Sequence, residues 1–285
     1  MTVSTKDISE LRARTGAGIG DCKKALEEAG GDMEKAGELL RKKGIAKAEK
    51  RAGRTASQGL VLLDAAADGS AAALLELDCE TDFVARTDDF GAMGTKLVAR
   101  VRAALAPGHW ASASDADVLG VAFEGSTIGE AVQQLSAKTG EAVSIRRAAH
   151  FAPAGGAVGA YLHFNRQVGV IVEVAGASGA DAVALGNEVA LHIASADPIG
   201  VTTADIPAEL LERERRIAEE QVAAEGKPEN IRAKIVDGKV RKFAAERALL
   251  EQPFVKDESK TVGQLVAALK GASVVRFARF KVGEG

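Results

Sequence analysis

A carboxylate and an aromatic ring stand side by side in residues 80–86, which read ETDFVAR. The segment follows an apolar, strand-like run at residues 72–79 and precedes a helical pattern that begins near Thr87, so we expect an exposed turn. A phenylalanine left exposed there forgoes about 2 kcal/mol of burial. Spacing alone leaves two alternatives. Either Asp82 caps the coming helix while Phe83 covers its base, or Phe83 inserts into a partner protein.

A thiol beside these carboxylates is the other group that could do chemistry here. Cys79 directly precedes Glu80, and neighbouring carboxylates raise the pKa of a thiol, which disfavours the nucleophilic thiolate. We therefore expect Cys79 to pack at the end of its strand. A thiol enzyme is the weaker alternative, and unchanged activity in a Cys79→Ala variant would exclude it.

Residues of the types that bind metals are scattered along the chain. The histidines form no i,i+4 pair and have no cysteine neighbour, which argues against a zinc site. They are His109, His150, His163 and His192. His192 lies among apolar helix residues, so we expect it to pack in the core. The acidic residues after Cys79 lack the interleaved spacing of a calcium loop. The sequence thus predicts a protein that is not an enzyme and holds no metal or cofactor.

A glycine-rich stretch, GAGIG at residues 16–20, resembles a phosphate-binding loop because backbone amides at a helix start bind anions. The context of such a loop is missing. No strand precedes it, and Asp21 places a carboxylate where the phosphate would lie. We interpret the stretch as a turn between two helices, with nucleotide binding as the minor alternative.

Composition describes an ordinary globular chain: 285 residues, 46% hydrophobic, 4% aromatic and a net charge of −3. This charge provides no global positive field for nucleic acid. Two cysteines are too few for a disulfide framework and favour a reducing cytoplasm. The first residues lack the apolar core of a signal peptide, and Asp64 and Asp68 interrupt the apolar run at residues 60–77. We expect a cytoplasmic protein without a membrane span.

Residues 1–55 show the pattern of a module of three short helices. A capping box at residues 4–7 begins the first, residues 19–29 form the second, and Asp32 caps the third. Residues 41–54 are then strongly basic, which predicts a solvated linker helix. Contact with RNA is the alternative, although no aromatic residue is interleaved for base stacking. The lysines concerned are Lys42, Lys43, Lys47 and Lys50.

After a boundary at residues 55–59 the apolar period changes from helical to extended. Residues 60–66 and 72–79, separated by Asp68 and Gly69, predict a hairpin. A helix over residues 87–105, a polar loop through Ser114, a helix beginning at Ser126 and Thr127, and a strand at residues 143–151 follow. Together these elements predict a first core subdomain at residues 56–151.

Residues 152–285 repeat this plan. A hairpin at residues 159–164 and 168–174 precedes a helix at residues 181–195, and TVGQLV at residues 261–266 echoes TIGEAV at residues 127–132. A strand at residues 274–280 ends the copy. The order of hairpin, helix, helix and strand occurs twice, which predicts an α+β fold of two similar subdomains with antiparallel sheets.

The two copies differ in two places. The second copy has AGAS at residues 175–178 where the first has the Asp-Phe tip, so the tip is unique. It also carries an insertion at about residues 207–250, which predicts two helices, 208–224 and 229–249, split by Gly226-Lys227-Pro228. Their apolar residues are spaced for a narrow seam, as in a coiled-coil hairpin. They are Leu210, Ile217, Ile231, Ile235, Val240 and Phe243.

Several ordered motifs give the chain a resemblance to a known family. They read LRARTGAG at residues 11–18, DCKKAL at 21–26, ETDFVAR at 80–86, GKP at 226–228, QPFV at 252–255 and KTVGQL at 260–265. Taken together, they resemble bacterial translation elongation factor Ts over essentially the whole chain. The resemblance implies a ubiquitin-associated-like N-terminal module and a duplicated core with a coiled-coil insertion.

The resemblance also implies a function: guanine nucleotide exchange on the GTPase elongation factor Tu, with its GDP-bound form as substrate. Thr81, Asp82, Phe83 and Val84 would be the intruding tip, with Phe83 wedged near the bound Mg²⁺ of the GTPase. Arg12 and Ile19 would help to dock the N-terminal module on the GTPase domain. No membrane or direct nucleic acid contact is implied, and an RNA- or ribosome-associated module using the basic linker is the alternative.

Two departures from the family limit what is carried over. Members often have two methionines where this chain has Ile19-Gly20, so contacts made there should be smaller. Some members continue beyond the position of Gly285 into a C-terminal helix that also touches the partner. That contact is not carried over to this chain.

Overall fold

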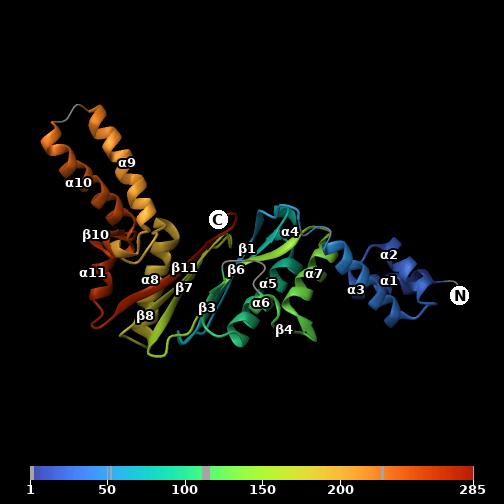
Figure 1. The fold of residues 1–285 in the computed structure, drawn as a ribbon. Helices are drawn as coiled ribbons and strands as arrows, with labels where there is room; N and C mark the ends of the chain where they lie inside the picture. The colour runs from blue at the N-terminus through green and yellow to red at the C-terminus, as the bar shows by residue number, and fades with distance from the viewer. Residues whose placement is uncertain (1–2, 50, 52, 111–115, 226–227, 285) are drawn as a thin grey trace.

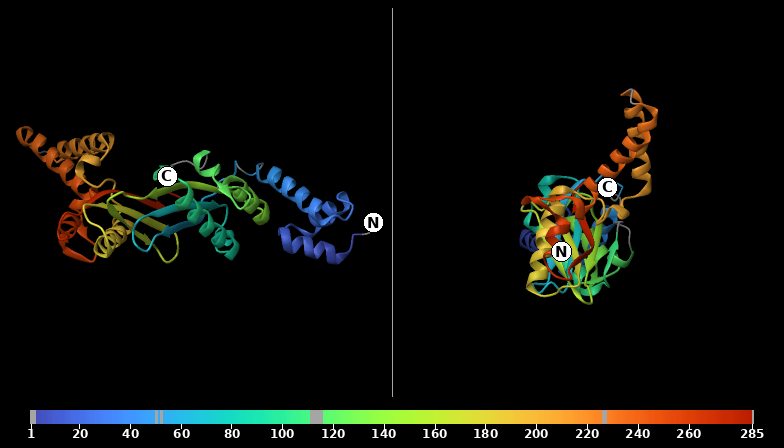
Figure 2. Two further views of the ribbon diagram at one scale, coloured as in Figure 1. Left: turned by 90° about the horizontal axis from the view of Figure 1, so that it is seen from below. Right: turned by 90° about the vertical axis from the view of Figure 1, so that its left-hand side faces the viewer.

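The structure, a computed structural model, describes residues 3–49, 51, 53–110, 116–225 and 228–284. Three helices lie at one end, two antiparallel sheets with their helices form the middle, and a helical hairpin projects from the other end (Figure 1). Figure 2 shows the hairpin extending well beyond the body of the molecule. The predicted α+β class is therefore confirmed.

The N-terminal module has the three predicted helices: α1 (Thr5–Thr15), α2 (Ile19–Glu28) and α3 (Met33–Glu49). The predicted capping box begins α1, because the Ser4 hydroxyl accepts from the Asp7 N–H at 3.1 Å and the Asp7 carboxylate accepts from the Ser4 N–H at 3.2 Å. Gly16 ends α1 at φ 68°, a left-handed conformation that glycine adopts readily. A small buried core holds the three helices together; it comprises Leu11, Cys22, Ala25, Leu26, Ala36 and Leu40.

The basic segment is not a separate linker helix, because α3 continues through it to Glu49. Along this segment α3 packs against α7 (Ile128–Thr139), and a Cβ added at Gly44 would lie 2.9 Å from the Ala137 Cβ. Arg41 pairs with Glu130 at 2.7 Å, and Lys43 pairs with Glu28 at 2.7 Å. Two of its cations thus have carboxylate partners. Lys50 lies outside the described residues, and RNA contact stays an untested alternative.

The first sheet has four antiparallel strands in the order β1-β2-β6-β3. They are β1 (Gln58–Ala65), β2 (Ala72–Cys79), β6 (Val143–Phe151) and β3 (Gly108–Trp110). Helices α5 (Asp88–Ala104) and α7 cover one face, burying Leu75, Phe90 and Leu97. The short elements α6 (Ala116–Leu119), β4 (Ala122–Phe123) and β5 (Ser126–Thr127) lead into α7.

The prediction of a loop after α5 is wrong for the first residues of that segment. Gly108 and Trp110 pair with His150 and Ala148 of β6, so this short segment becomes an edge strand. The rest of that loop, including Ser114, falls outside the described residues. Sheet pairing with a strand some forty residues later is not visible in the local pattern.

The second sheet has three antiparallel strands in the order β11-β8-β7. They are β7 (Gly156–Leu162), β8 (Val168–Ala175) and β11 (Ser273–Lys281), with α8 (Ala180–Ala196) and α11 (Val262–Ala267) between β8 and β11. Short elements complete this part: η1 (Thr203–Asp205), η2 (Leu249–Glu251), β9 (Pro253–Phe254) and β10 (Asp257–Thr261). In both sheets the final strand joins the second strand of the hairpin, so the predicted repeat is confirmed. The domain limits at residues 55 and 151 stay a prediction.

The two sheets pack against each other through one apolar cluster, which includes Val61, Leu74, Phe151, Ile171 and Phe280. Their helices cover the opposite faces and form two further clusters. Because β2 is covered on both sides, all of its residues are buried. This explains why residues 72–75 are apolar without interruption and lack the alternation of a half-exposed strand.

The insertion forms the predicted helical hairpin, with α9 (Ala208–Ala224) and α10 (Glu229–Arg247). The seam between the helices buries Ala218, Val222, Val236 and Val240. Ile217 and Ile231 were expected in this seam, but they are 39% and 40% exposed. Small residues face the seam because two helices approach most closely where side chains are short. Gly226 and Lys227 of the predicted turn lie outside the described residues.

His192 packs in the core of the second sheet, as predicted, and has a hydrogen bond at each ring nitrogen. The Val255 N–H donates to Nδ1 at 3.2 Å, so Nε2 carries the proton and donates to the Gln252 side-chain oxygen at 2.9 Å. Burial lowers the pKa of this imidazole. A neutral histidine in this position links α8 to the segment that follows the hairpin.

Two carboxylates are buried near the end of β2. Glu76 pairs with Arg147 at 2.6 Å, whereas one oxygen of Asp78 has no hydrogen-bond partner in the part of the chain that the structure describes. Burial and the adjacent Glu76 carboxylate raise the pKa of Asp78 to about 7, although Arg146 and Arg147 lower it. The folded protein therefore keeps a proton on Asp78 at pH values where the unfolded chain has lost it.

This carboxylate should make stability depend on pH. With a folded pKa above the unfolded value of 3.8, the fold loses stability as pH rises from about 4 to about 7. We expect Asp78→Asn to raise the free energy of unfolding by about 2 kcal/mol at pH 8, and by less at pH 5. Urea unfolding at both pH values measures this difference, and an equal gain at both would contradict it.

Candidate partner-binding site

Residues 82–85 form a single helical turn, α4 (Asp82–Ala85), between β2 and α5. Threonine hydroxyls cap both helices: Thr81 accepts from the Val84 N–H at 3.3 Å, and Thr87 accepts from the Phe90 N–H at 3.4 Å. The alternative in which Asp82 caps the coming helix is therefore wrong. Asp82 instead pairs with Arg86 at 2.9 Å on the surface of α4.

The Phe83 side chain points into solvent and is 80% exposed. The alternative in which it covers the base of the helix is therefore also wrong. Val84 and the buried Ala85 hold the other side of α4 on the first core cluster. The four predicted tip residues thus divide into two anchors, Thr81 and Val84, and two outward groups, Asp82 and Phe83.

Cys79 lies below this turn as a packing residue, as expected. Its side chain is fully buried, and the thiol donates to the Thr81 carbonyl at 3.1 Å. Burial first, and then the Glu141 carboxylate, raises the pKa of Cys79 to about 12. A thiol in this state is a poor nucleophile at neutral pH.

Arg12 and Ile19 lie on the N-terminal module, at the end of α1 and the start of α2. Both are exposed, and Ile19 is 58% exposed, which is unusual for a large aliphatic side chain. The module and the body that carries α4 lie beside each other along the molecule (Figure 1). The structure does not bring Arg12 and Ile19 together with α4, so any shared partner must span both.

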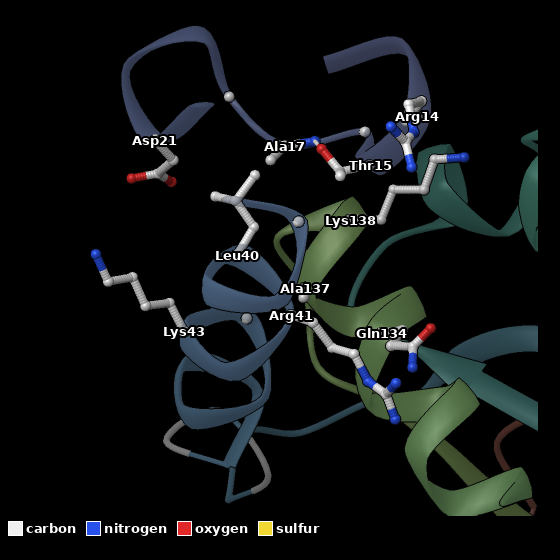
Figure 3. A pocket seen from close by; sticks show the side chains of 14 residues that line it. Arg14, Thr15, Ala17, Asp21, Leu40, Arg41, Lys43, Gln134, Ala137 and Lys138 are labelled. Carbon is white, nitrogen blue, oxygen red and sulfur yellow. Dashed lines mark hydrogen bonds between the residues drawn. The ribbon is translucent and has the colours of Figure 1, made fainter. Parts of the chain in front are cut away.

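A cavity of about 310 Å³ lies where the N-terminal module meets α7 (Figure 3). Its walls include the glycine-rich turn between α1 and α2, with Thr15 and Ala17, and also Leu40 of α3 and Ala137 of α7. Asp21 lines the cavity too, so a carboxylate is present as the sequence suggested. Within the stretch GAGIG, residues 16–18 form the expected turn between α1 and α2, and Ile19 and Gly20 begin α2.

The cations around this cavity are already paired with carboxylates. The pairs are Arg14 with Glu34, Arg41 with Glu130, Lys43 with Glu28, and Lys138 with Asp89, at 2.6–2.7 Å. In Figure 3 the Arg41 and Lys43 side chains point away from each other. Because each of these four cations already pairs with a carboxylate, the arrangement disfavours binding of a phosphate group.

A second exposed aromatic residue, Phe164, was not predicted. We expected a strand through this position, but β7 ends at Leu162, and Phe164 lies in the following turn with 89% of its surface exposed. The Arg166 carbonyl in the same turn accepts from the Val61 N–H of β1 at 2.8 Å. The turn, residues 163–167, reads HFNRQ, and Arg166 in it adopts φ 57°. The polar residues Asn165 and Arg166 were the signal from which the turn could have been predicted.

Among the described residues, no group of three or more His, Cys, Asp or Glu side chains could hold a metal ion. The helices in the described ranges also include none long and apolar enough to cross a membrane.

Comparison with known proteins gives one consistent family. The family model described as Elongation factor TS matches residues 80–284. A relative from Methylococcus capsulatus, named Elongation factor Ts, is 43% identical over 285 residues, which cover 100% of this chain and 94% of the relative. One from Micrococcus luteus with the same name is 46% identical over 283 residues, covering 97% of each chain. A third, from Thioalkalivibrio sulfidiphilus, is 44% identical over 286 residues, covering 100% of this chain and 94% of the relative.

Proposed function

The chain belongs to the elongation factor Ts family of translation elongation factors, and from this premise we propose that it is a guanine nucleotide exchange factor for elongation factor Tu. It would act on the GDP-bound GTPase and promote release of GDP, so that GTP can bind again. The observation that carries the proposal is the exposure of Phe83 on a capped and packed helical turn.

An exposed aromatic side chain on a rigid support is suited to insertion into another protein. An anchor that is already ordered loses little conformational freedom on binding, so more of its burial energy remains for the contact. Phe83 has this property because Val84 and Ala85 fix α4 on the core behind it. We propose that Phe83 inserts near the nucleotide site of elongation factor Tu.

The exchange mechanism needs no chemistry from this chain. In such GTPases, Mg²⁺ and the phosphate-binding loop hold the nucleotide electrostatically. Displacing the groups that hold the ion removes much of the affinity for GDP. An acceleration of about 10⁴-fold requires about 5.5 kcal/mol, which one buried phenylalanine together with lost ion contacts can supply. By linkage, GDP lowers the affinity of elongation factor Tu for this protein by the same factor as this protein lowers the affinity for GDP.

The remaining predicted residues have supporting roles in this proposal. The Asp82 carboxylate, 46% exposed beside Arg86, would compete for groups near the ion. Arg12 and the exposed Ile19 would dock the N-terminal module on the GTPase domain. We propose no direct contact with nucleic acid, and salt-dependent binding of RNA by this protein would argue against that part.

The direct test follows the release of fluorescent GDP from elongation factor Tu. A trace of this protein, added with excess unlabelled GDP, is expected to accelerate the decay of fluorescence, because each molecule acts repeatedly. EDTA without this protein is the positive control, since it removes Mg²⁺ directly. An unchanged release rate in the presence of this protein would refute the proposed function.

A further inference from the structure

Thr81, the residue before α4, is held by a carboxylate from a distant part of the chain. Its backbone N–H donates to Glu141 Oε2 at 3.0 Å, and its hydroxyl donates to Glu141 Oε1 at 2.6 Å. Both oxygens of Glu141 are thus used on one residue. With its hydrogen directed at Glu141, the hydroxyl keeps a lone pair free for the Val84 N–H, which it accepts at 3.3 Å.

The cap matters because α4 is too short to be stable alone. It has four residues, and a single turn fixes several dihedral angles for very few internal hydrogen bonds. Packing of Val84 and Ala85 holds one side, but Phe83 contributes no burial of its own. The orientation of Phe83 therefore depends on the contacts at Thr81.

A second carboxylate crosses in the opposite direction. Glu80 Oε1 accepts from the Ala142 N–H at 2.7 Å, so residues 80–81 and 141–142 hold each other reciprocally. Glu80 Oε1 also pairs with Arg54 at 3.3 Å. Arg54 belongs to the segment that connects α3 to β1, so this segment is attached directly to the base of the tip.

The same segment contacts α7 through a second arginine. Arg51 donates to the Ser136 carbonyl at 3.3 Å, and the Ser136 hydroxyl donates to the Glu141 carbonyl at 2.5 Å. Ser136 is 2% exposed, so these bonds are shielded from water. The end of α7 thus connects the segment after the N-terminal module with the residue that holds Thr81.

We propose that Glu141 is a positioning residue for the exchange reaction: its carboxylate fixes Thr81 so that α4 presents Phe83 in one orientation. Glu80 and Arg54 extend this clamp to the segment that follows the N-terminal module. The inference rests on the proposed function, because it gives Glu141 its role through Phe83. It assigns no contact between Glu141 and the partner.

Local opening of α4 gives a test that does not involve elongation factor Tu. Chymotrypsin cleaves after phenylalanine once the segment unfolds, and Phe164, in an exposed turn, is an internal reference site in the same chain. We expect Glu141→Ala to speed cleavage after Phe83 at least about tenfold, because two hydrogen bonds to a charged acceptor are lost. Cleavage after Phe164 should not change.

Two further variants sharpen this measurement. Glu141→Gln keeps one acceptor oxygen and is expected to give an intermediate rate. Glu124→Ala, which removes a carboxylate paired with Lys96 on the same body at 2.9 Å, should leave cleavage after Phe83 unchanged. An unchanged rate in Glu141→Ala would overturn the clamp, whether or not the protein exchanges nucleotides.

Exchange kinetics then test the role of the clamp. Glu141→Ala is expected to lower kcat/KM for GDP release about tenfold, with a smaller loss in Glu141→Gln. In a Phe83→Ala background the same substitution should have no further effect, since it acts through Phe83. Additive losses in the double variant would overturn the positioning role. Absence of exchange by the unmodified protein, with rapid cleavage in Glu141→Ala, would instead refute the proposed function and leave the clamp standing.

Discussion

Phe83→Ala is expected to lower the rate of GDP release from elongation factor Tu about a hundredfold. Burial of a phenylalanine in a partner provides up to about 3 kcal/mol, and each 1.36 kcal/mol corresponds to about tenfold in rate. The stability of the folded protein should change little, because the side chain is 80% exposed. Fluorescent GDP release measures the first quantity, and urea unfolding measures the second.

Matched variants separate the wedge from a general loss of apolar surface. Val275→Ala removes a side chain that is 50% exposed on β11, and exchange should be unchanged. Asp82→Ala should lower the rate of GDP release less than Phe83→Ala does, because Arg86 already pairs with the Asp82 carboxylate at 2.9 Å. If Phe83→Ala exchanges at the unmodified rate, the wedge mechanism is wrong even where the protein is active.

Local pattern was sufficient for the elements that carry strong periodicity and clear ends. β2, β6 and α9 have the predicted limits, because apolar runs bounded by turn residues specify both where they begin and where they end. The repeated order of elements also predicted two related sheets. It predicted that the two subdomains pack together, but not which faces of the sheets meet, since that depends on which face of each strand is covered by which partner.

The parts that failed depend on contacts between distant residues. α4 was expected as a turn, and its cap residue Thr81 is held in place by hydrogen bonds to Glu141, sixty residues later. β3 needs its pairing with β6. In the hairpin, Ile217 and Ile231 fit the spacing of a seam, but the helices meet on the side of Ala218 and Val236. Spacing alone could not choose between these faces.

The candidate site shows the same limit. The sequence placed Asp82 and Phe83 at a tip, but the spacing slightly favoured the alternative in which Phe83 folds back. Exposure of the ring follows from three-dimensional packing: Val84 and Ala85 already occupy the surface that Phe83 would have covered. Phe164 was missed because its position continues an apolar strand pattern, and the end of β7 is set by the turn that Arg166 fastens to β1.

Gly159→Ala is expected to destabilise the second sheet by about 3 kcal/mol or more. Gly159 of β7 lies directly against Gly186 of α8, and a Cβ added at Gly159 would be 2.0 Å from the Gly186 carbonyl carbon. The obstacle is backbone on both sides, so no side chain can rotate away. The helix would have to move off the sheet, exposing buried residues such as Val189.

The first sheet supplies the comparison, because the repeat places equivalent residues there. α5 and α8 both have 17 residues, and Gly94 and Gly186 each follow the first residue of their helix by six positions. Opposite Gly94, however, lies the side chain of Leu62, and an added Cβ would meet its Cγ at 2.8 Å. The Leu62 side chain would have to shift, which a side chain can do more easily than backbone, and alanine is about 1 kcal/mol better than glycine within a helix.

Gly94→Ala should therefore change the free energy of unfolding by less than about 1 kcal/mol, whereas Gly186→Ala should lose about 2 kcal/mol. In Gly186→Ala the added Cβ would lie 2.8 Å from Gly159 backbone atoms. The free-energy cost of this overlap exceeds the gain from the higher helix propensity of alanine. Urea unfolding followed by circular dichroism compares the two variants with Gly159→Ala. Equal losses at residues 94 and 186 would show that helix α8 approaches its sheet no more closely than α5 does.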